Sequence, residues 1–276
     1  MGGTYRAHGD ELLTPAEDAQ TALLLEAGTG KPGNVGPERD FDDTTFHEFL
    51  VGAVGARRGF DAAAEGASVG EVFLESVRGA SAHDGGNTQF GALLLLAPLV
   101  VAAGRGSVED APAVAEGTTP EDAGRFYEAF DHVDVHVGDT GYEYDVRDPE
   151  AREKVVEDGV TLYEVMEESA SRDGIADEWT DGFARTFHAG SRLVGRPGGT
   201  REAVRATYVD LLGEEPDSLV AERCGSEKAR EVTRLARELP PDELDERLGD
   251  EGINPGTTAD IVAGAVFVAL RRGWRI

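Results

Sequence analysis

Three glycine-rich turns of this chain combine polar side chains with the start of a helix. They are KPGNVGPERDFDDTTF (31–46), HDGGNTQFGALLLLAPL (83–99) and GINPGTTADIVAGAVFVAL (252–270). Glycine lets backbone amides approach a ligand closely, and the start of a helix offers unpaired N–H groups with a partial positive charge. Three such turns in one chain suggest that they converge around a polyanion.

The first turn carries one of only three lysines in the chain. Lys31 supplies a positive charge, and Gly33 and Asn34 belong to the tight turn beside it, where phosphate oxygens could bind. Asp42 and Asp43 directly precede a predicted helix, which leaves two interpretations open. They either cap that helix or hold a divalent ion such as Mg²⁺, which takes one or two carboxylates together with phosphate oxygens and water.

The other two turns have the same two interpretations. Asn87 and Thr88 precede the most apolar helix, where each could act as an N-cap or bind an anion with the helix-start amides. Gly256 and Thr257 open the last helix, Thr257 or the threonine after it is expected to cap that helix, and Asp260 lies in its first turn. An aspartate there also interacts favourably with the helix dipole.

The composition excludes several classes of function. The chain has 54 acidic and 26 basic residues in 276, so its net charge is 26 − 54 = −28, and the carboxylates are spread along its whole length. This charge argues against binding nucleic acid or an anionic membrane through a broad surface. The content of 40% hydrophobic residues argues against disorder. We interpret the acidity and the scarcity of lysine as adaptation to an organism with high internal salt.

Other features indicate a soluble intracellular protein. Cys224 is the only cysteine, which excludes an intrachain disulfide and indicates a small buried residue. The N-terminal stretch has no basic and apolar regions of a signal peptide. The longest apolar run, Phe90 to Ala103, is too short to span a bilayer and is expected to be a core helix. We therefore expect a cytoplasmic location.

Helical patterns dominate the chain and predict an all-α fold, with residues 1–276 forming one domain of ten or more helices. Thr14-Pro15 and Thr119-Pro120 are helix-start signals, and Phe46, Phe49, Leu50 and Val54 have the spacing of one helical face. In the second half, helices are predicted at about 149–158, 160–173, 177–190, 200–213, 217–223, 226–238, 242–248 and 257–272. Only VDVHV (133–137) alternates like a strand. The apolar face of the last helix is either core or a contact in a homodimer.

Taken together, the three turns resemble motifs of the triphosphoribosyl-dephospho-CoA synthase family. Members have a PKPG turn followed by an acidic helix start, an NT-x-x-G segment that opens an apolar helix, and a late PG-x-x-AD motif. The corresponding segments here are KPGNVGPERDFDDTTF, GGNTQFGALLLLAPL and NPGTTADIVA, in the same order. The resemblance extends over nearly the whole chain. Two departures flank the expected substrate site: GKPG stands for PKPG, and NPGTTAD stands for SPGGSAD.

The resemblance implies an all-α enzyme that moves the 5-triphosphoribosyl group of ATP to the ribose 2′-hydroxyl of dephospho-CoA and releases adenine. Mg²⁺ is then the expected cofactor, and Asp42, Asp43 and Asp260 are the expected metal ligands or catalytic carboxylates. A group of seven further residues is expected to bind substrate or phosphate: Lys31, Gly33, Asn34, Asn87, Thr88, Gly256 and Thr257. Lys31 would supply local positive charge for the triphosphate.

Three other functions stay open at this stage. The same donor chemistry could serve a different acceptor, such as another coenzyme or a pterin. A second possibility is hydrolysis, since ADP-ribosylglycohydrolases are also all-α and carry a D-D-T element, as Asp42-Asp43-Thr44 does here. However, this chain lacks their late G-D-x-D-T motif. The third is a helical protein that binds nucleotide without turnover.

Overall fold

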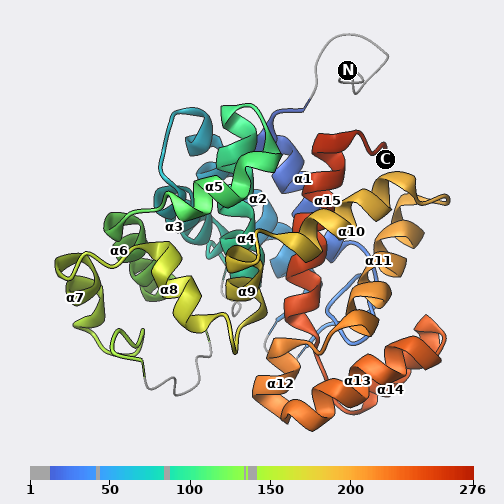
Figure 1. The fold of residues 1–276 in the computed structure, drawn as a ribbon. Coiled ribbons are helices and arrows are strands. Elements are labelled where there is room, and N and C mark those ends of the chain that lie inside the picture. Colours follow the sequence, from blue (N-terminus) through green and yellow to red (C-terminus); the bar gives the residue numbers. More distant parts are fainter. Residues whose placement is uncertain (1–12, 42–43, 84–87, 134, 136–141) are drawn as a thin grey trace.

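The computed structural model describes residues 13–41, 44–83, 88–133, 135 and 142–276. Within these residues the chain folds into fifteen α-helices and two short 3₁₀ helices, with no strand (Figure 1). The first eight helices are α1 (Pro15–Ala27), α2 (Phe46–Ala64), α3 (Val69–Ala80), α4 (Phe90–Arg105), α5 (Ala111–Glu116), α6 (Pro120–Ala129), α7 (Ala151–Glu157) and α8 (Leu162–Ser169). The others are α9 (Gly174–Thr180), α10 (Ala184–Gly195), α11 (Thr200–Glu214), α12 (Ser218–Cys224), α13 (Ser226–Glu238), α14 (Pro241–Asp250) and α15 (Gly256–Arg272). The predicted all-α class is confirmed.

Two apolar helices form the centre of the molecule. Most residues of α4 and α15 are buried on every side, as expected of helices that lack a polar face. The two helices pack against each other, with α1 contacting both, and α10 covers another side of α15 (Figure 1). The first turns of α4 and α15 lie near each other, so any site at these helix starts rests on the two central helices.

Helices α2 and α3 pack closely because glycines line their contact. A Cβ atom added to Gly55 would overlap the backbone of Gly79, and one added to Gly59 would overlap Ser76 and Val72. The buried face of α2 therefore consists of small residues and Phe60. The apolar spacing that begins at Phe46 indicates a different face, and its last member, Val54, is 58% exposed.

The helix predicted at 177–190 is wrong, because the chain breaks there into α9 and α10. Gly182 and Phe183 both have left-handed backbone conformations, with φ values of 66° and 60°. Phe183 is fully buried, which compensates for this unusual conformation of a bulky residue. The Glu178 carboxylate then accepts hydrogen bonds from the amides of Arg185 (3.2 Å) and Thr186 (2.9 Å), and so caps α10 from the preceding helix.

Several other predictions can be compared with the structure. Thr14 and Thr119 cap α1 and α6 with capping boxes, as their sequences predicted. The apolar face of α15 is core, since Ile261 and Val266 are 0% exposed.

Cys224 is exposed at the end of α12, so its predicted burial is wrong. Residues 134, 136 and 137 of the predicted strand lie outside the described residues. No helix in the described part of the chain is long and apolar enough to cross a membrane.

Candidate functional site

The first glycine turn is held by three elements from the second half of the chain. The side-chain Nδ2 of Asn34 donates to Asn254 Oδ1 (2.6 Å), and this hydrogen bond joins the first and third turns directly. The Gly33 N–H donates to Asp245 Oδ1 in α14 (2.9 Å), and the Tyr208 hydroxyl in α11 donates to the Pro32 carbonyl (2.8 Å). The predicted convergence of these two turns is therefore present.

Gly33 and Asn34 have structural reasons for their identities. Gly33 has a φ of 78°, and a Cβ there would lie 2.5 Å from the Ile253 carbonyl oxygen. Any other residue would push the first turn away from the third. Asn34 is 6% exposed and bridges the same two turns. Their predicted role in substrate binding stays a prediction.

Lys31 lies inside the protein with its charge already compensated. Its side chain is 0% exposed and forms a 2.8 Å ion pair with Glu26. The ammonium also donates to the backbone carbonyls of Glu26 (2.7 Å) and Thr29 (3.2 Å) at the end of α1. All three ammonium protons therefore have acceptors within the protein. The predicted contact with phosphate stays a prediction, but in this arrangement Lys31 neutralises a buried carboxylate.

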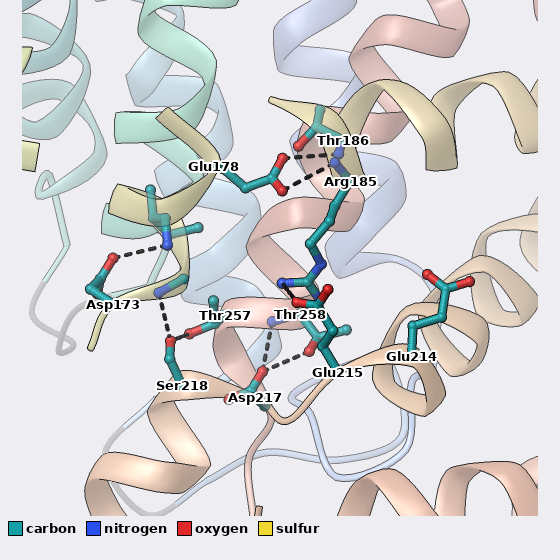
Figure 2. A network of polar contacts seen from close by, with 12 residues as sticks. Asp173, Glu178, Arg185, Thr186, Glu214, Glu215, Asp217, Ser218, Thr257 and Thr258 are labelled. Carbon is teal, nitrogen blue, oxygen red and sulfur yellow. Dashed lines mark hydrogen bonds and ion pairs between the residues drawn. The ribbon is translucent and has the colours of Figure 1, made fainter. Parts of the chain in front are cut away.

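The start of α15 is fixed by the start of α12, as Figure 2 shows. Asp217 Oδ2 accepts from both the N–H and the hydroxyl of Thr258 (2.7 Å each), and Asp217 Oδ1 accepts from the Val220 N–H (3.0 Å). One carboxylate thus caps its own helix and α15 together. The sequence predicted that Thr257 or Thr258 caps α15. This prediction is wrong, because the N-cap residue is Pro255 and the capping carboxylate belongs to Asp217.

A second bridge brings α9 to the same place. Ser218 Oγ forms a 2.9 Å hydrogen bond with Thr257 Oγ1 and accepts a 3.0 Å hydrogen bond from the Gly174 N–H (Figure 2). A Cβ on Gly174 would lie 2.9 Å from Thr257 Cγ2, so the close approach requires glycine. A Cβ on Gly256 would likewise come too close to the Leu219 side chain. Thr257 and Gly256 therefore connect helix starts, and their predicted contacts with phosphate stay untested.

Asp260 joins the start of α15 to the start of α4. The Ala92 N–H, the third amide of α4, lies near enough to the Asp260 carboxylate to lower its pKa, and this is the amide that an N-cap side chain usually satisfies. A Cβ on Gly91 would overlap Asp260 Oδ2, so glycine makes this approach possible. Asp260 thereby brings the second and third motifs together, as the sequence predicted. Unlike the fully buried Asp217, it keeps part of its surface exposed.

Several carboxylates gather around Asp260 at this end of the bundle. Burial raises the pKa of Asp260 well above its usual range, and the nearby charges of Glu26, Asp217 and Asp173 raise this pKa further. Burial also raises the pKa of Asp217, against the opposing effect of its hydrogen bonds from Thr258. Such shifts are common where carboxylates take part in catalysis or bind cations.

Arg185 is the cation that faces this network from α10. Its guanidinium pairs with Glu215 (3.4 Å), and its charge lowers the pKa of both Asp217 and Glu178 (Figure 2). Burial still prevails at Glu178 and raises its pKa. The carboxylates of the network are therefore only partly neutralised.

Three predicted site residues lie outside the described residues: Asp42, Asp43 and Asn87. Thr88 is described, and its hydroxyl faces α2, where a Cβ on Gly52 would lie 2.9 Å from Thr88 Oγ1. Within the described part of the chain, no three His, Cys, Asp or Glu residues are grouped as metal ligands. Mg²⁺ bound mainly by a polyphosphate needs only one or two protein carboxylates, and Asp260 can supply one of them.

Several residues of this site were missed from the sequence, and four of them illustrate why. Glu26 and Asp217 resemble ordinary surface acids in a chain with 54 of them, so their types carry no signal. Ser218 follows Asp217 as a common helix start. Gln89 lies between Thr88, which was predicted to bind substrate, and an apolar run, and it is 3% exposed. Only its place within the second turn could have drawn attention to it.

Comparison with known proteins identifies relatives over nearly the whole chain. A family model described as ATP:dephospho-CoA triphosphoribosyl transferase matches residues 13–276. Among solved structures, the chain is similar to that of an Archaeoglobus fulgidus protein described as a triphosphoribosyl-dephospho-CoA synthase. The TM-score is 0.72 and the sequence identity 31%, over 84% of this chain and 100% of the other. No match was found among curated proteins.

Proposed function

This chain belongs to the ATP:dephospho-CoA triphosphoribosyl transferase family, and we propose that the helix starts around Asp260 form its active site. The reaction is the transfer of the triphosphoribosyl group from ATP to dephospho-CoA. The observation that supports this location is the single carboxylate that links the second and third motifs, at the start of the two central helices. No comparison favours a pterin acceptor, hydrolysis or binding without turnover.

The transfer replaces one bond at C1′ of the ATP ribose. The bond from C1′ to adenine N9 breaks, and its electron pair leaves with the base. The 2′-hydroxyl oxygen of dephospho-CoA bonds to C1′, and its proton is available to the departing adenine through a carboxylate base. Because positive charge develops on the ribose ring, nearby carboxylates stabilise the transition state. We assign this electrostatic role to Asp260, and an aspartate is also suitable as the base.

The charge of the site supports a requirement for Mg²⁺. A triphosphate brought to this end of the bundle would lie beside carboxylates, and Lys31 of the first turn is already paired with Glu26. Asp260 would help to hold a divalent cation there, and the cation would offset the negative charge of the phosphates. The ion would supply charge neutralisation and hold the triphosphate in place, with Asp42 and Asp43 as the other expected ligands.

Three properties of the whole protein belong to the same proposal. We expect an intracellular enzyme that works in high salt, because its charge of −28 needs screening. We keep a homodimer as an expectation, although the apolar face of α15 cannot provide the contact because it is core. Binding of ATP itself is expected from the reaction and is measurable directly.

The test is the release of free adenine, followed by chromatography, from ATP and Mg²⁺ with and without dephospho-CoA in multimolar KCl. We expect adenine only when the acceptor is present. Asp260→Asn should lower kcat by about 100-fold or more, as expected for a catalytic carboxylate. Asp242→Asn is the matched control, since the Asp242 side chain is 87% exposed and pairs only with Arg205 among the described residues. Equal rates for the two variants would refute the location of the site.

A further inference from the structure

The Gln89 side chain is buried at the start of α4 without a hydrogen-bond partner. Gln89 is 3% exposed, and neither its Nε2 nor its Oε1 has a partner among the described residues. A carboxamide offers two N–H donors and two acceptor lone pairs. Buried polar groups are almost always paired in folded proteins, because an unpaired one costs free energy. Among the described residues the carboxamide is therefore left available for a ligand.

Gln89 and Asp260 lie at the same helix start. Gln89 is the residue directly before α4, and the amides and glycine that Asp260 contacts follow in the first turn of that helix. On its other side the carboxamide packs closely against α2, since a Cβ on Gly52 would lie 3.4 Å from Gln89 Oε1. Asp260 and Gln89 therefore both lie at the first turn of α4, where a ligand could approach a carboxylate and a neutral carboxamide.

The donor and acceptor of a carboxamide indicate which part of the substrates it can bind. A triphosphate offers only acceptors, so it would leave the Oε1 acceptor of Gln89 unmatched. Adenine presents a donor and an acceptor side by side, the N6 amino group and N7, which is the edge that Asn and Gln recognise in pairs of hydrogen bonds. Guanine presents two acceptors at the same edge and fits poorly.

We propose that Gln89 binds the adenine of ATP, with Oε1 accepting from the N6 amino group and Nε2 donating to N7. This inference rests on the proposed function. Adenine is bonded to C1′ of the ribose, and the proposed function has Asp260 stabilise the charge that develops there. The base must therefore lie close to Asp260, within about the length of one purine ring system. The hydrogen bond to N7 also stabilises the adenine as it leaves with the electron pair of the broken bond. Gln89 is thus a specificity residue for the nucleotide.

The test compares ATP with 7-deaza-ATP, which lacks the N7 acceptor, in wild type and Gln89→Leu. We measure kcat/KM for base release at fixed dephospho-CoA, and the dissociation constant of each nucleotide without acceptor. Wild type should prefer ATP by about 5- to 150-fold, and Gln89→Leu should lose most of that preference. Gln20→Leu is the matched control, because Gln20 lies in the middle of α1 and contacts Arg57. Its preference should equal that of wild type.

The same variants separate the other outcomes. Gln89→Leu should melt at or above the temperature of wild type, because it removes an unpaired buried carboxamide. A preference for ATP that is unchanged in Gln89→Leu would overturn the inference. Dephospho-CoA also carries adenine, so the same comparison is made between dephospho-CoA and its 7-deaza analogue as a second arm. A loss of preference in that arm alone would overturn the assignment to ATP. If wild type releases no base at all, the proposed function fails, while the nucleotide-binding arm still decides the role of Gln89.

Discussion

Replacing Asp217 with alanine should destabilise the protein and displace the start of α15. The Asp217 carboxylate is 2% exposed and accepts three hydrogen bonds, two from Thr258 and one from the Val220 N–H. Alanine leaves two backbone N–H groups of helix starts without an acceptor. Since Asp260 lies in the first turn of the same helix, the displacement should also reach the carboxylate that contacts α4.

The expected cost follows from the hydrogen bonds that are lost. Three hydrogen bonds at about 1 kcal/mol each give about 3 kcal/mol, and the two orphaned N–H groups increase this toward about 5 kcal/mol. Burial raises the pKa of Asp217, so removal of a poorly solvated charge offsets part of the loss. A cost of about 3–4 kcal/mol corresponds to a lowering of Tm by about 10 °C in a protein of this size.

The assay is thermal unfolding followed by circular dichroism in multimolar KCl, together with the rate of adenine release. Asp210→Ala is the matched control, because the Asp210 side chain is 40% exposed and pairs with Arg196 at the surface. The control should melt close to wild type. An Asp217→Ala protein that melts within about 2 °C of wild type, at full activity, would refute the assignment of Asp217 as the common cap.

The pH dependence of the same site has a definite sign. The pKa of Asp217 is raised in the folded protein, so its contribution to stability is complete below the pKa of an unfolded aspartate and decreases as the pH rises through the folded value. Asp217→Asn does not titrate. The stability advantage of wild type over Asp217→Asn should therefore be largest near pH 4 and become smaller toward pH 8. An advantage that grows over this range would contradict the raised pKa.

Three further predictions concern stability. Lys31→Met should cost about 3–5 kcal/mol in urea unfolding, because it leaves the Glu26 carboxylate buried and unpaired, and the double variant with Glu26→Gln should recover more than half of this. If the double variant is no more stable than the single one, the pair is not the cause. Gly59→Ala should cost about 3 kcal/mol or more by forcing α2 away from α3, whereas Gly104→Ala, whose Cβ would have 3.8 Å of space, should be neutral or stabilising; equal effects would refute the close packing. Melting temperatures should rise strongly from low to multimolar KCl, and equal midpoints would contradict a role for charge repulsion.

Local signals allowed most helices to be predicted from the sequence. Thr14 and Thr119, each followed by proline, marked the starts of α1 and α6 because an N-cap side chain bonds to amides only two or three residues away. The apolar content of α4 identified it as a core helix, whereas that of α15 left core and a dimer contact open until the structure showed this face to be buried. The α9–α10 break was missed because Phe183, a bulky residue, adopts a left-handed conformation that its type does not favour.

The site was predicted only in outline, because its caps come from distant parts of the chain. The meeting of the three turns followed from their shared chemistry, and Asp260 does join the second to the third. The partner of Thr258 is Asp217, 41 residues away, and no local pattern distinguishes Asp217 from other aspartates. Lys31 illustrates the same limit. Its type and neighbours predicted a phosphate contact, which stays a prediction. Its partner in the structure, Glu26, could not be predicted, because it depends on how the chain turns back at the end of α1.

The most direct test of the central claim is mass spectrometry of the product formed from ATP, Mg²⁺ and dephospho-CoA in multimolar KCl, with adenine quantified in the same sample. We predict that the mass of dephospho-CoA increases by that of one triphosphoribosyl group and that one adenine is released for each product molecule. Adenine without a modified dephospho-CoA, or unchanged ATP under conditions where it binds, would contradict the account.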